Sequence, residues 1–128
     1  MSELATTIGD FAVSFTATSG VTPGRGYRLL IASDGTYGLA GINDVGQGFN
    51  QYTVSAAGGS GTYKPTNAPG SQVAVASEAI AVGDRCYTVA GGKVSKTATS
   101  AIFIGNAKQA ATGDGVLFEL IVNGGAGL

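Results

Sequence analysis

Glycine divides this sequence into short pieces. It accounts for 22 of the 128 residues, and together with other turn-forming residues it interrupts the chain every several positions. The intervening runs are rich in Val, Ile, Tyr, Phe and Thr, which are typical of β-strands. A hydrophobic fraction of 44% is enough to build a core, so we expect the chain to fold. The pattern predicts an all-β fold with short strands in one domain of ordinary size.

The segment 11–18 has the alternation of a half-buried strand, with small or hydroxyl residues opposite an apolar face. The apolar residues are Phe11, Val13 and Phe15. Pro23 and its neighbouring glycines end this segment, because proline cannot donate to a strand ladder. We therefore expect an N-terminal arm or edge strand over residues 1–22 and a single β domain over residues 23–128.

Two hairpins are predicted, over residues 26–40 and 85–97, because Asp34-Gly35 and Gly91-Gly92 suit tight turns. Further strands are expected at 49–54, 72–76, 101–105 and 116–122. The last of these is apolar on both faces except at Glu119, which predicts a central strand. Residues 77–84 fit either a short helical turn or an irregular corner. The expected architecture is a small barrel or sandwich of eight to ten strands, with room for one short helix.

The segment 55–71 contains almost no core-forming residues and many flexible ones. It is predicted to be a long glycine-rich loop, which in a compact domain marks a binding element or a surface tip. Tyr63 has no local core to join, so Tyr63 and its neighbour Lys64 are expected to be exposed contact residues of this loop.

A weak internal echo relates residues 31–54 to residues 85–122. Gly41 and Val54 have the same separation as Gly105 and Phe118, which is compatible with an old duplication. Short β-rich chains produce such coincidences freely, so the echo carries little weight.

The chain has no histidine and one cysteine. It therefore cannot supply a Ser-His-Asp or Cys-His pair, a zinc cluster or an intrachain disulfide. Cys86 lies in an apolar run and is expected to be buried and unreactive. We expect no catalytic residues, no cofactor and no metal, and we predict that the protein is not an enzyme.

The charged residues fit structural roles. Aspartates that precede or follow glycines act mainly as turn residues, and no segment has the spacing of a calcium loop. They are Asp34, Asp84 and Asp114, with Asp44 a fourth acidic candidate. Lys93 and Lys96 are expected to pair with Glu119 across neighbouring strands.

Charge and hydropathy also limit the partners. Seven Lys and Arg residues nearly cancel eight Asp and Glu residues, so the electrostatic footprint of a nucleic-acid binder is absent. No apolar stretch approaches the ~18 residues that a membrane span needs, so we expect a soluble species with neither partner. A weakly charged surface is compatible with extensive contact to other proteins.

The second half of the chain resembles the capsid cement, or head decoration, proteins of tailed bacteriophages. The matching stretches are residues 79–94, 104–107 and 113–118, in which an apolar-Gly-Asp step precedes a glycine hairpin, an Ile-Gly-x-Ala step and a Gly-Asp turn into a closing strand. Order and approximate spacing agree from Val73 to Val122, and the first half matches more loosely through residues 39–42.

This resemblance implies a β-barrel-like structural protein that binds the outside of an assembled phage head, commonly as a homotrimer. It would bridge subunits of the major capsid protein on the virion, after synthesis in the host cytoplasm. We assign the apolar face of residues 1–22 to the capsid, by strand addition to an exposed edge; its residues are Phe11, Val13 and Phe15. The alternatives are a head-fibre base, or a carbohydrate-binding β module on the virion surface that uses Tyr63. A small enzyme is a weaker alternative because histidine is absent.

Overall fold

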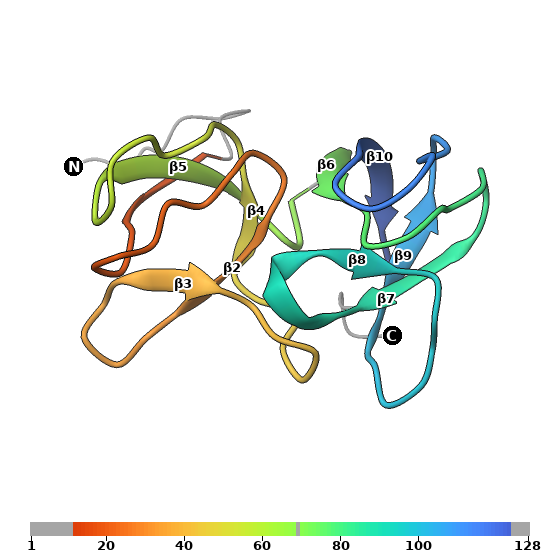
Figure 1. Cartoon of the computed structure of the whole chain (residues 1–128), viewed down its shortest axis with the longest axis horizontal. Coiled ribbons are helices and arrows are strands. Elements are labelled where there is room, and N and C mark those ends of the chain that lie inside the picture. The colour runs from red at the N-terminus through yellow and green to blue at the C-terminus, as the bar shows by residue number, and fades with distance from the viewer. Residues whose placement is uncertain (1–11, 69, 124–128) are drawn as a thin grey trace.

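A computed structural model describes residues 12–68 and 70–123 of the chain, which form two antiparallel five-stranded sheets (Figure 1). The first sheet contains β1 (Val13–Thr16), β2 (Arg28–Ile31), β3 (Tyr37–Leu39), β4 (Gly48–Asn50) and β5 (Ser60–Pro65). The second contains β6 (Ser71–Val75), β7 (Arg85–Thr88), β8 (Val94–Ser95), β9 (Phe103–Ala107) and β10 (Leu117–Val122). The predicted all-β, sandwich-like class is confirmed, and neither sheet closes into a barrel.

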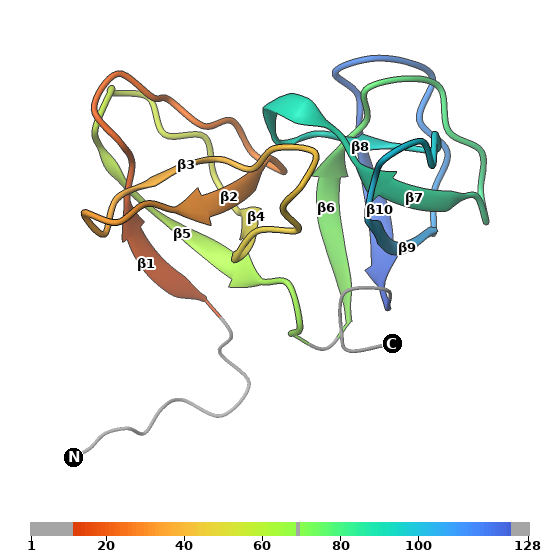
Figure 2. The same cartoon turned by 90° about the horizontal axis from the view of Figure 1, so that it is seen from below.

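The two sheets have the same topology. Their strand orders are β1-β5-β4-β2-β3 and β6-β10-β9-β7-β8, so in each half of the chain the fifth strand lies between the first and the fourth. We call the two halves the first repeat (residues 13–65) and the second repeat (residues 71–122). Figure 2 shows them side by side, with β4 next to β6 at the junction.

Equivalent backbone hydrogen bonds fix the register of the repetition. Gly26 N donates to Asn50 O at 2.8 Å, and 57 positions later Gly83 N donates to Ala107 O at 2.8 Å. The bond from Val54 N to Pro23 O recurs from Ala111 N to Ile80 O, each at 2.9 Å. Isolated parallel bridges also recur, at Ala17 with Tyr37 and at Ala76 with Val94. The repetition is real, but the register suggested by Gly41 and Gly105 is wrong.

Glycine is required at equivalent places in both repeats. Gly26 and Gly83 both have φ of +87°, a left-handed conformation that costs glycine little. At Gly48 a side-chain carbon would clash with the carbonyl of Lys64, and at Gly105 with that of Ile121. The two repeats therefore share the backbone geometry of these turns and close strand approaches, although most of their side chains differ.

The predicted hairpins are confirmed as β2–β3 and β7–β8, the latter turning through a short 3₁₀ segment, η2 (Ala90–Gly92). β10 is an internal strand between β6 and β9, as expected. Its outer face is not fully covered, since Leu117 and Ile121 remain exposed. The strand expected at 49–54 is shorter, and residues 77–84 form an irregular corner rather than a helical turn.

The long loop predicted over 55–71 is wrong. Its centre is β5, which pairs with β1 on one side and with β4 on the other. Loop structure is confined to the residues before and after this strand. The glycine-rich composition suggested flexibility, but pairing with two distant strands satisfies the backbone of Ser60–Pro65.

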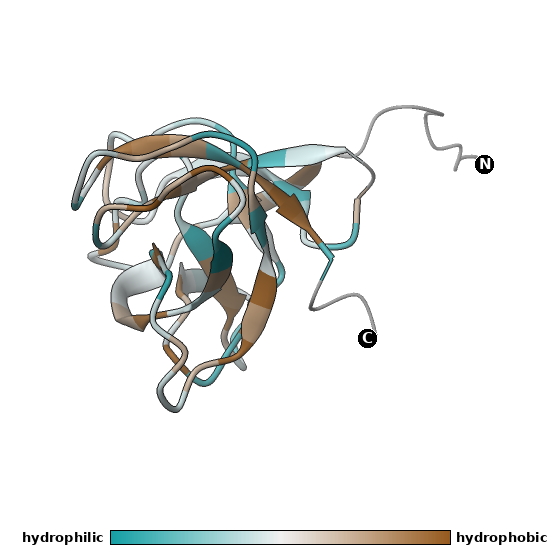
Figure 3. Ribbon diagram, turned by 90° about the vertical axis from the view of Figure 1, so that its right-hand side faces the viewer, coloured by the Kyte–Doolittle hydropathy of each residue, from teal (hydrophilic) through white to brown (hydrophobic). Residues whose placement is uncertain are grey.

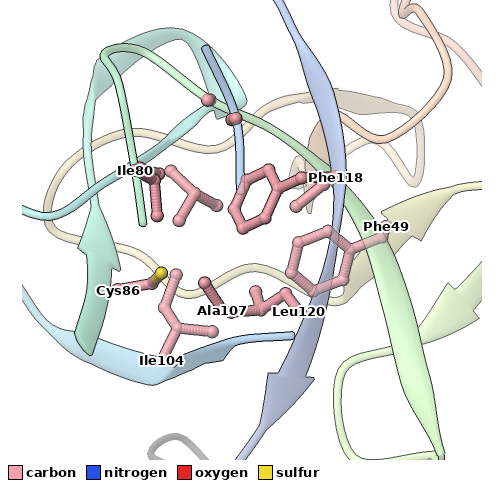
Figure 4. Close-up of a cluster of buried hydrophobic side chains, with 11 residues drawn as sticks. Phe49, Ile80, Cys86, Ile104, Ala107, Phe118 and Leu120 are labelled. Atoms are coloured by element: carbon pink, nitrogen blue, oxygen red, sulfur yellow. The ribbon is translucent and has the colours of Figure 1, made fainter. Parts of the chain in front are cut away.

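Each repeat has its own core. In the first, Phe15, Leu29, Val54 and Tyr63 pack together with Ala17. The second gathers a larger set around Phe118, Leu120 and Ile104, and Phe49 of β4 in the first repeat joins it (Figure 4). Cys86 is fully buried there as predicted, and burial raises the pKa of its thiol to about 12.

Arg28 joins the two repeats. It is fully buried, and its guanidinium donates to carbonyls of the second repeat, from Nε to Lys93 O at 3.0 Å and from Nη2 to Val89 O at 2.6 Å. Further carbonyls of the first repeat accept from it, at Gly41, Asp44 and Val45. Burial lowers the pKa of Arg28 to about 10, so the group stays charged at neutral pH. The charge is thus surrounded by backbone dipoles from both halves of the chain.

Two further bonds cross this junction. Gly92 N donates to Ala40 O at 2.8 Å, and the buried Thr88 hydroxyl donates to Ile42 O at 2.5 Å. The same hydroxyl accepts from Ile102 N.

Replacing Thr88 with valine removes both of these hydroxyl bonds while keeping the shape of the side chain. The Ile42 carbonyl and the Ile102 amide lose a partner, so we expect the free energy of unfolding to fall by about 1–2 kcal/mol. Urea unfolding measures this change. Thr62→Val is the matched control, because its partly buried hydroxyl donates to the Gln51 side chain within the first repeat, and we expect a smaller effect. Equal losses would contradict a special role of Thr88 at the junction.

Candidate interaction surfaces

β1 lies at an edge of the first sheet. It pairs with β5, and within residues 12–68 and 70–123 no strand pairs with its other side. Val13, at 37% exposure, stands opposite Tyr63 on this edge. Phe11 lies outside the described residues. An edge of this kind can accept a strand from another chain through its backbone groups.

Phe15 does not contribute to an exposed apolar face. It is 5% exposed, and its ring packs against Tyr37 and Tyr63 with centroid distances of 5.5 and 5.9 Å. The expectation that Phe15 faces a partner is therefore wrong for this conformation, because the residue belongs to the core of the first repeat. Of the three apolar residues assigned to the capsid, Val13 is the one that the structure describes as accessible.

Tyr63 was expected to be an exposed loop contact, and this is wrong. The residue lies in β5 and is 6% exposed. Its hydroxyl lies 3.1 Å from that of Tyr37, and burial raises the pKa of Tyr63 to about 12. Tyr63 is a core residue because β1 and β4 flank its strand, a placement that depends on contacts far along the sequence.

Lys64 points to the other face of β5. It is half-buried, and its Nζ donates to the carbonyl of Ser71 at 3.0 Å. It lines a small polar cleft of about 190 Å³ with Asn50, Tyr52 and Gln72 at the seam between the repeats. The Asn50 side-chain oxygen is buried and has no hydrogen-bond partner among the described residues. The exposed aromatic residue here is Tyr52 rather than Tyr63.

A larger groove opens on the first repeat, between β1 and the β2–β3 hairpin. Its volume is about 570 Å³, and it is lined by Ser14, Phe15, Thr16, Ile31, Gly35, Tyr37, Ser60 and Gly61. Ile31, at 44% exposure, is an apolar residue at its rim. We call this the hairpin groove. Sequence analysis missed it, because its walls come from three separate segments and its signal is a lone exposed isoleucine.

The aspartates serve turns and surface pairs. Asp34 accepts from Thr36 N at 3.0 Å and from its hydroxyl at 2.7 Å, and Asp84 accepts from Ala81 N. Asp114 pairs with Lys93 at 2.7 Å. The predicted pairs of Lys93 and Lys96 with Glu119 are wrong, because Glu119 contacts Lys108 and Ser71.

Among the described residues there is no group of three or more His, Cys, Asp or Glu side chains that could hold a metal ion. The described part of the chain also contains no helix with the length and hydropathy needed to cross a membrane.

Glu78 predicts a pH effect on stability. Hydrogen bonds from the hydroxyls of Ser95 and Thr97 lower the pKa of Glu78 below its usual 4.5. The folded state therefore binds this proton less tightly than the unfolded state, and the stabilisation is present above pH 4.5 and lost as the pH falls through the folded pKa. Glu78→Gln should reduce the loss of stability below pH 4.5, measured by urea midpoints. Asp34 and Glu119 have pKa values lowered in the same direction, so part of the loss should remain. An unchanged pH profile would contradict this role.

Comparison with known proteins gives a likeness in fold. No protein-family model and no curated protein matches this chain. Among solved structures, it is similar to the head fiber gp8.5 N base of bacteriophage phi29, with a TM-score of 0.66 and 24% sequence identity. The match covers 88% of this chain and 94% of the head fiber base. This chain therefore has the fold of that base.

Proposed function

We propose that this chain is a structural protein of a tailed-phage virion that attaches to the outside of the head. The observation that carries the proposal is the fold match over 94% of a phage head fiber base. The resemblance of residues 79–94, 104–107 and 113–118 to head decoration proteins supports the same role. A fold match and a motif pattern are separate observations, and both support the proposal of a structural protein of a phage virion.

In the more specific form of the proposal, the chain bridges neighbouring subunits of the major capsid protein and acts mechanically rather than catalytically. Its copies would associate, as a homotrimer in the resembled family, so that several modest contacts add through effective concentration. The β1 edge, with Val13 accessible, supplies a contact by strand addition. Bridging would raise the force needed to separate capsid subunits against the pressure of the packaged genome.

The second candidate is the base of a head fibre, which the identity of the structural neighbour favours directly. Such a base would bind the head and carry a further fibre segment without strengthening the shell. The carbohydrate-binding alternative loses the residue on which it depended, since Tyr63 is buried.

Co-sedimentation of the full chain with purified heads of its phage, stripped of outer proteins, tests attachment. We expect saturable, stoichiometric binding, and a loss of affinity on the order of tenfold in Val13→Asp. Val82→Asp is the matched control, because Val82 is exposed on the irregular corner of the second repeat. Absence of binding to heads would refute the proposal, and equal binding by both variants would refute the β1 contact.

The thermal disruption temperature of saturated heads separates the two candidates. A bridging protein should raise this temperature, whereas a fibre base should bind without raising it. Calorimetry of bare and saturated heads measures the difference.

A further inference from the structure

The internal junction shows how one repeat of this fold binds another. We call the surface of the first repeat that enters this junction the donor face, whatever the direction of its hydrogen bonds. It consists of Arg28, Phe49 and the carbonyls of residues 40–45. The receiving face of the second repeat presents Thr88, the hairpin 89–93 and, beside Gly26, the side chains of Val75 and Leu117. The contact is heterologous, because two different faces meet.

Each repeat should therefore carry both faces. The receiving face of the first repeat and the donor face of the second repeat are not used in the internal junction. The receiving face of the first repeat is found by subtracting the 57-residue offset. Thr88, Gly92 and Leu117 correspond to Ile31, Gly35 and Ser60. These three residues line the hairpin groove. The hairpin groove of the first repeat is therefore equivalent to the receiving face of the second repeat, which the first repeat contacts in the internal junction.

The donor face of the second repeat is also uncovered. Arg85 corresponds to Arg28, but it is exposed where Arg28 is fully buried. Its guanidinium stacks 3.9 Å from the centre of the Phe103 ring and donates to the Tyr87 hydroxyl. Residues 97–102, which correspond to the carbonyl loop 40–45, are largely exposed. Figure 3 views the molecule from this end, where hydrophobic and hydrophilic segments are mixed along the strands.

We infer that copies of this chain associate head to tail, with the donor face around Arg85 of one copy seated in the hairpin groove of the next. The occupant is a second copy because the chain already contains this contact once, between its own repeats. Charge agrees, since the hairpin at the groove carries the exposed Asp34 opposite the incoming Arg85. This inference specifies the self-association proposed above, but it rests on the repeat geometry and does not require binding to heads. Ser14 and Thr16 of β1 line the groove, whereas Val13, the residue assigned to the capsid, does not.

The contact between copies should be more polar than the internal junction. Asn106 stands where the first repeat has Phe49, so no aromatic ring enters the neighbour's core from this position. Heterologous contacts form a ring when the rotation between units closes, and an open chain when it does not.

Cysteine pairs test the geometry. The internal bond from Thr88 to Ile42 corresponds to a contact between Ile31 of one copy and Thr99 of the next. Under mild oxidation, the full chain carrying Ile31→Cys and Thr99→Cys should form disulfide-linked multimers on a non-reducing gel. A mixture of the two single variants should give linked pairs only. The pair Val82→Cys with Thr99→Cys is the control, and it should remain unlinked because Val82 does not line the hairpin groove, in which Thr99 of the next copy is expected to lie. Cys86 is buried and should not interfere.

Sedimentation over a range of concentrations tests the energetics. We expect wild type to be oligomeric, and Arg85→Glu to raise the dissociation constant on the order of tenfold or more. Arg25→Glu makes the same charge change at an exposed residue outside both faces and should leave the association unchanged.

An oligomer unaffected by Arg85→Glu, with no specific crosslink, would overturn the inference while leaving self-association intact. A wild-type monomer that associates only after residues 1–11 are removed would also overturn it, because the groove would then have an occupant within its own chain. Head binding is measured separately, so either failure is distinguishable from failure of the proposed function.

Discussion

Gly105→Ala should lower the free energy of unfolding by about 4 kcal/mol or more, a loss seen only when a substitution breaks a specific structural feature. A side-chain carbon at this position would overlap the carbonyl oxygen of Ile121 and crowd the backbone of Val122 in the paired strand. The obstacle is main chain rather than the end of a flexible side chain. Relief would require β9 and β10 to separate at the centre of the second sheet.

Chemical denaturation of matched variants measures this effect. Gly113→Ala is the control, because nothing lies within 4 Å of the added carbon and its φ is not in the left-handed region. It should change stability by no more than about 0.5 kcal/mol. Gly48→Ala should be as damaging as Gly105→Ala, since the two positions are equivalent in the repeats. A loss below about 1 kcal/mol in Gly105→Ala would contradict the close pairing described for these strands.

Arg28→Met should cost about 3–5 kcal/mol, although the replacement fills much of the same volume. Four carbonyl oxygens at the junction lose the guanidinium as donor, and a fifth, Gly41 O, keeps the amide of Asp44 at 3.4 Å. Each buried orphaned acceptor carries a desolvation penalty of about 1–3 kcal/mol unless water reaches it. The carbonyls belong to both repeats, so the loss of Arg28 weakens the junction between the repeats. Separation of the repeats would also expose Phe49. We expect the unfolding midpoint to fall and cooperativity between the repeats to weaken.

Arg85→Met is the natural control for this experiment. It removes the equivalent arginine of the second repeat, which is exposed and stacks on Phe103. Loss of an exposed cation–π contact should cost at most about 1 kcal/mol. Equal losses in the two variants would show that Arg28 does not join the repeats as described.

Local patterns predicted the fold well where turns and hydrophobic runs coincide. The hairpins around Gly35 and Gly91 and the central position of β10 follow from neighbouring residues alone. The burial of Cys86 follows in the same way from its apolar run. The hairpins depend on contacts that are short in sequence, and the apolar runs of β10 and around Cys86 signal burial locally although their partners are distant.

The failures share a dependence on distant contacts. β5 was predicted as a loop because glycine and proline occur at Ser60–Pro65, yet its pairing with β1 and β4 buries Tyr63. Arg28 resembles an ordinary surface cation in the sequence, and its partner Lys93 is 65 residues away. Neither placement can be derived from a local pattern.

The duplication was hidden for a related reason. Between residues 23–65 and 80–122, identical residues stand at five aligned positions. They are Gly26 with Gly83, Arg28 with Arg85, Gly35 with Gly92, Gly48 with Gly105, and Gly58 with Gly115. The four glycine pairs either have positive φ or allow a close approach of two strands. The side chains of the two repeats differ at most positions, but glycine is retained where the backbone conformation requires it.

Imaging by electron cryomicroscopy of heads incubated with this protein tests its role most directly. We predict regularly placed density on the outer surface of the shell, into which the two-repeat structure fits with the β1 edge against the capsid. Heads that carry no added density at saturating protein, or density confined to the interior, would contradict the account.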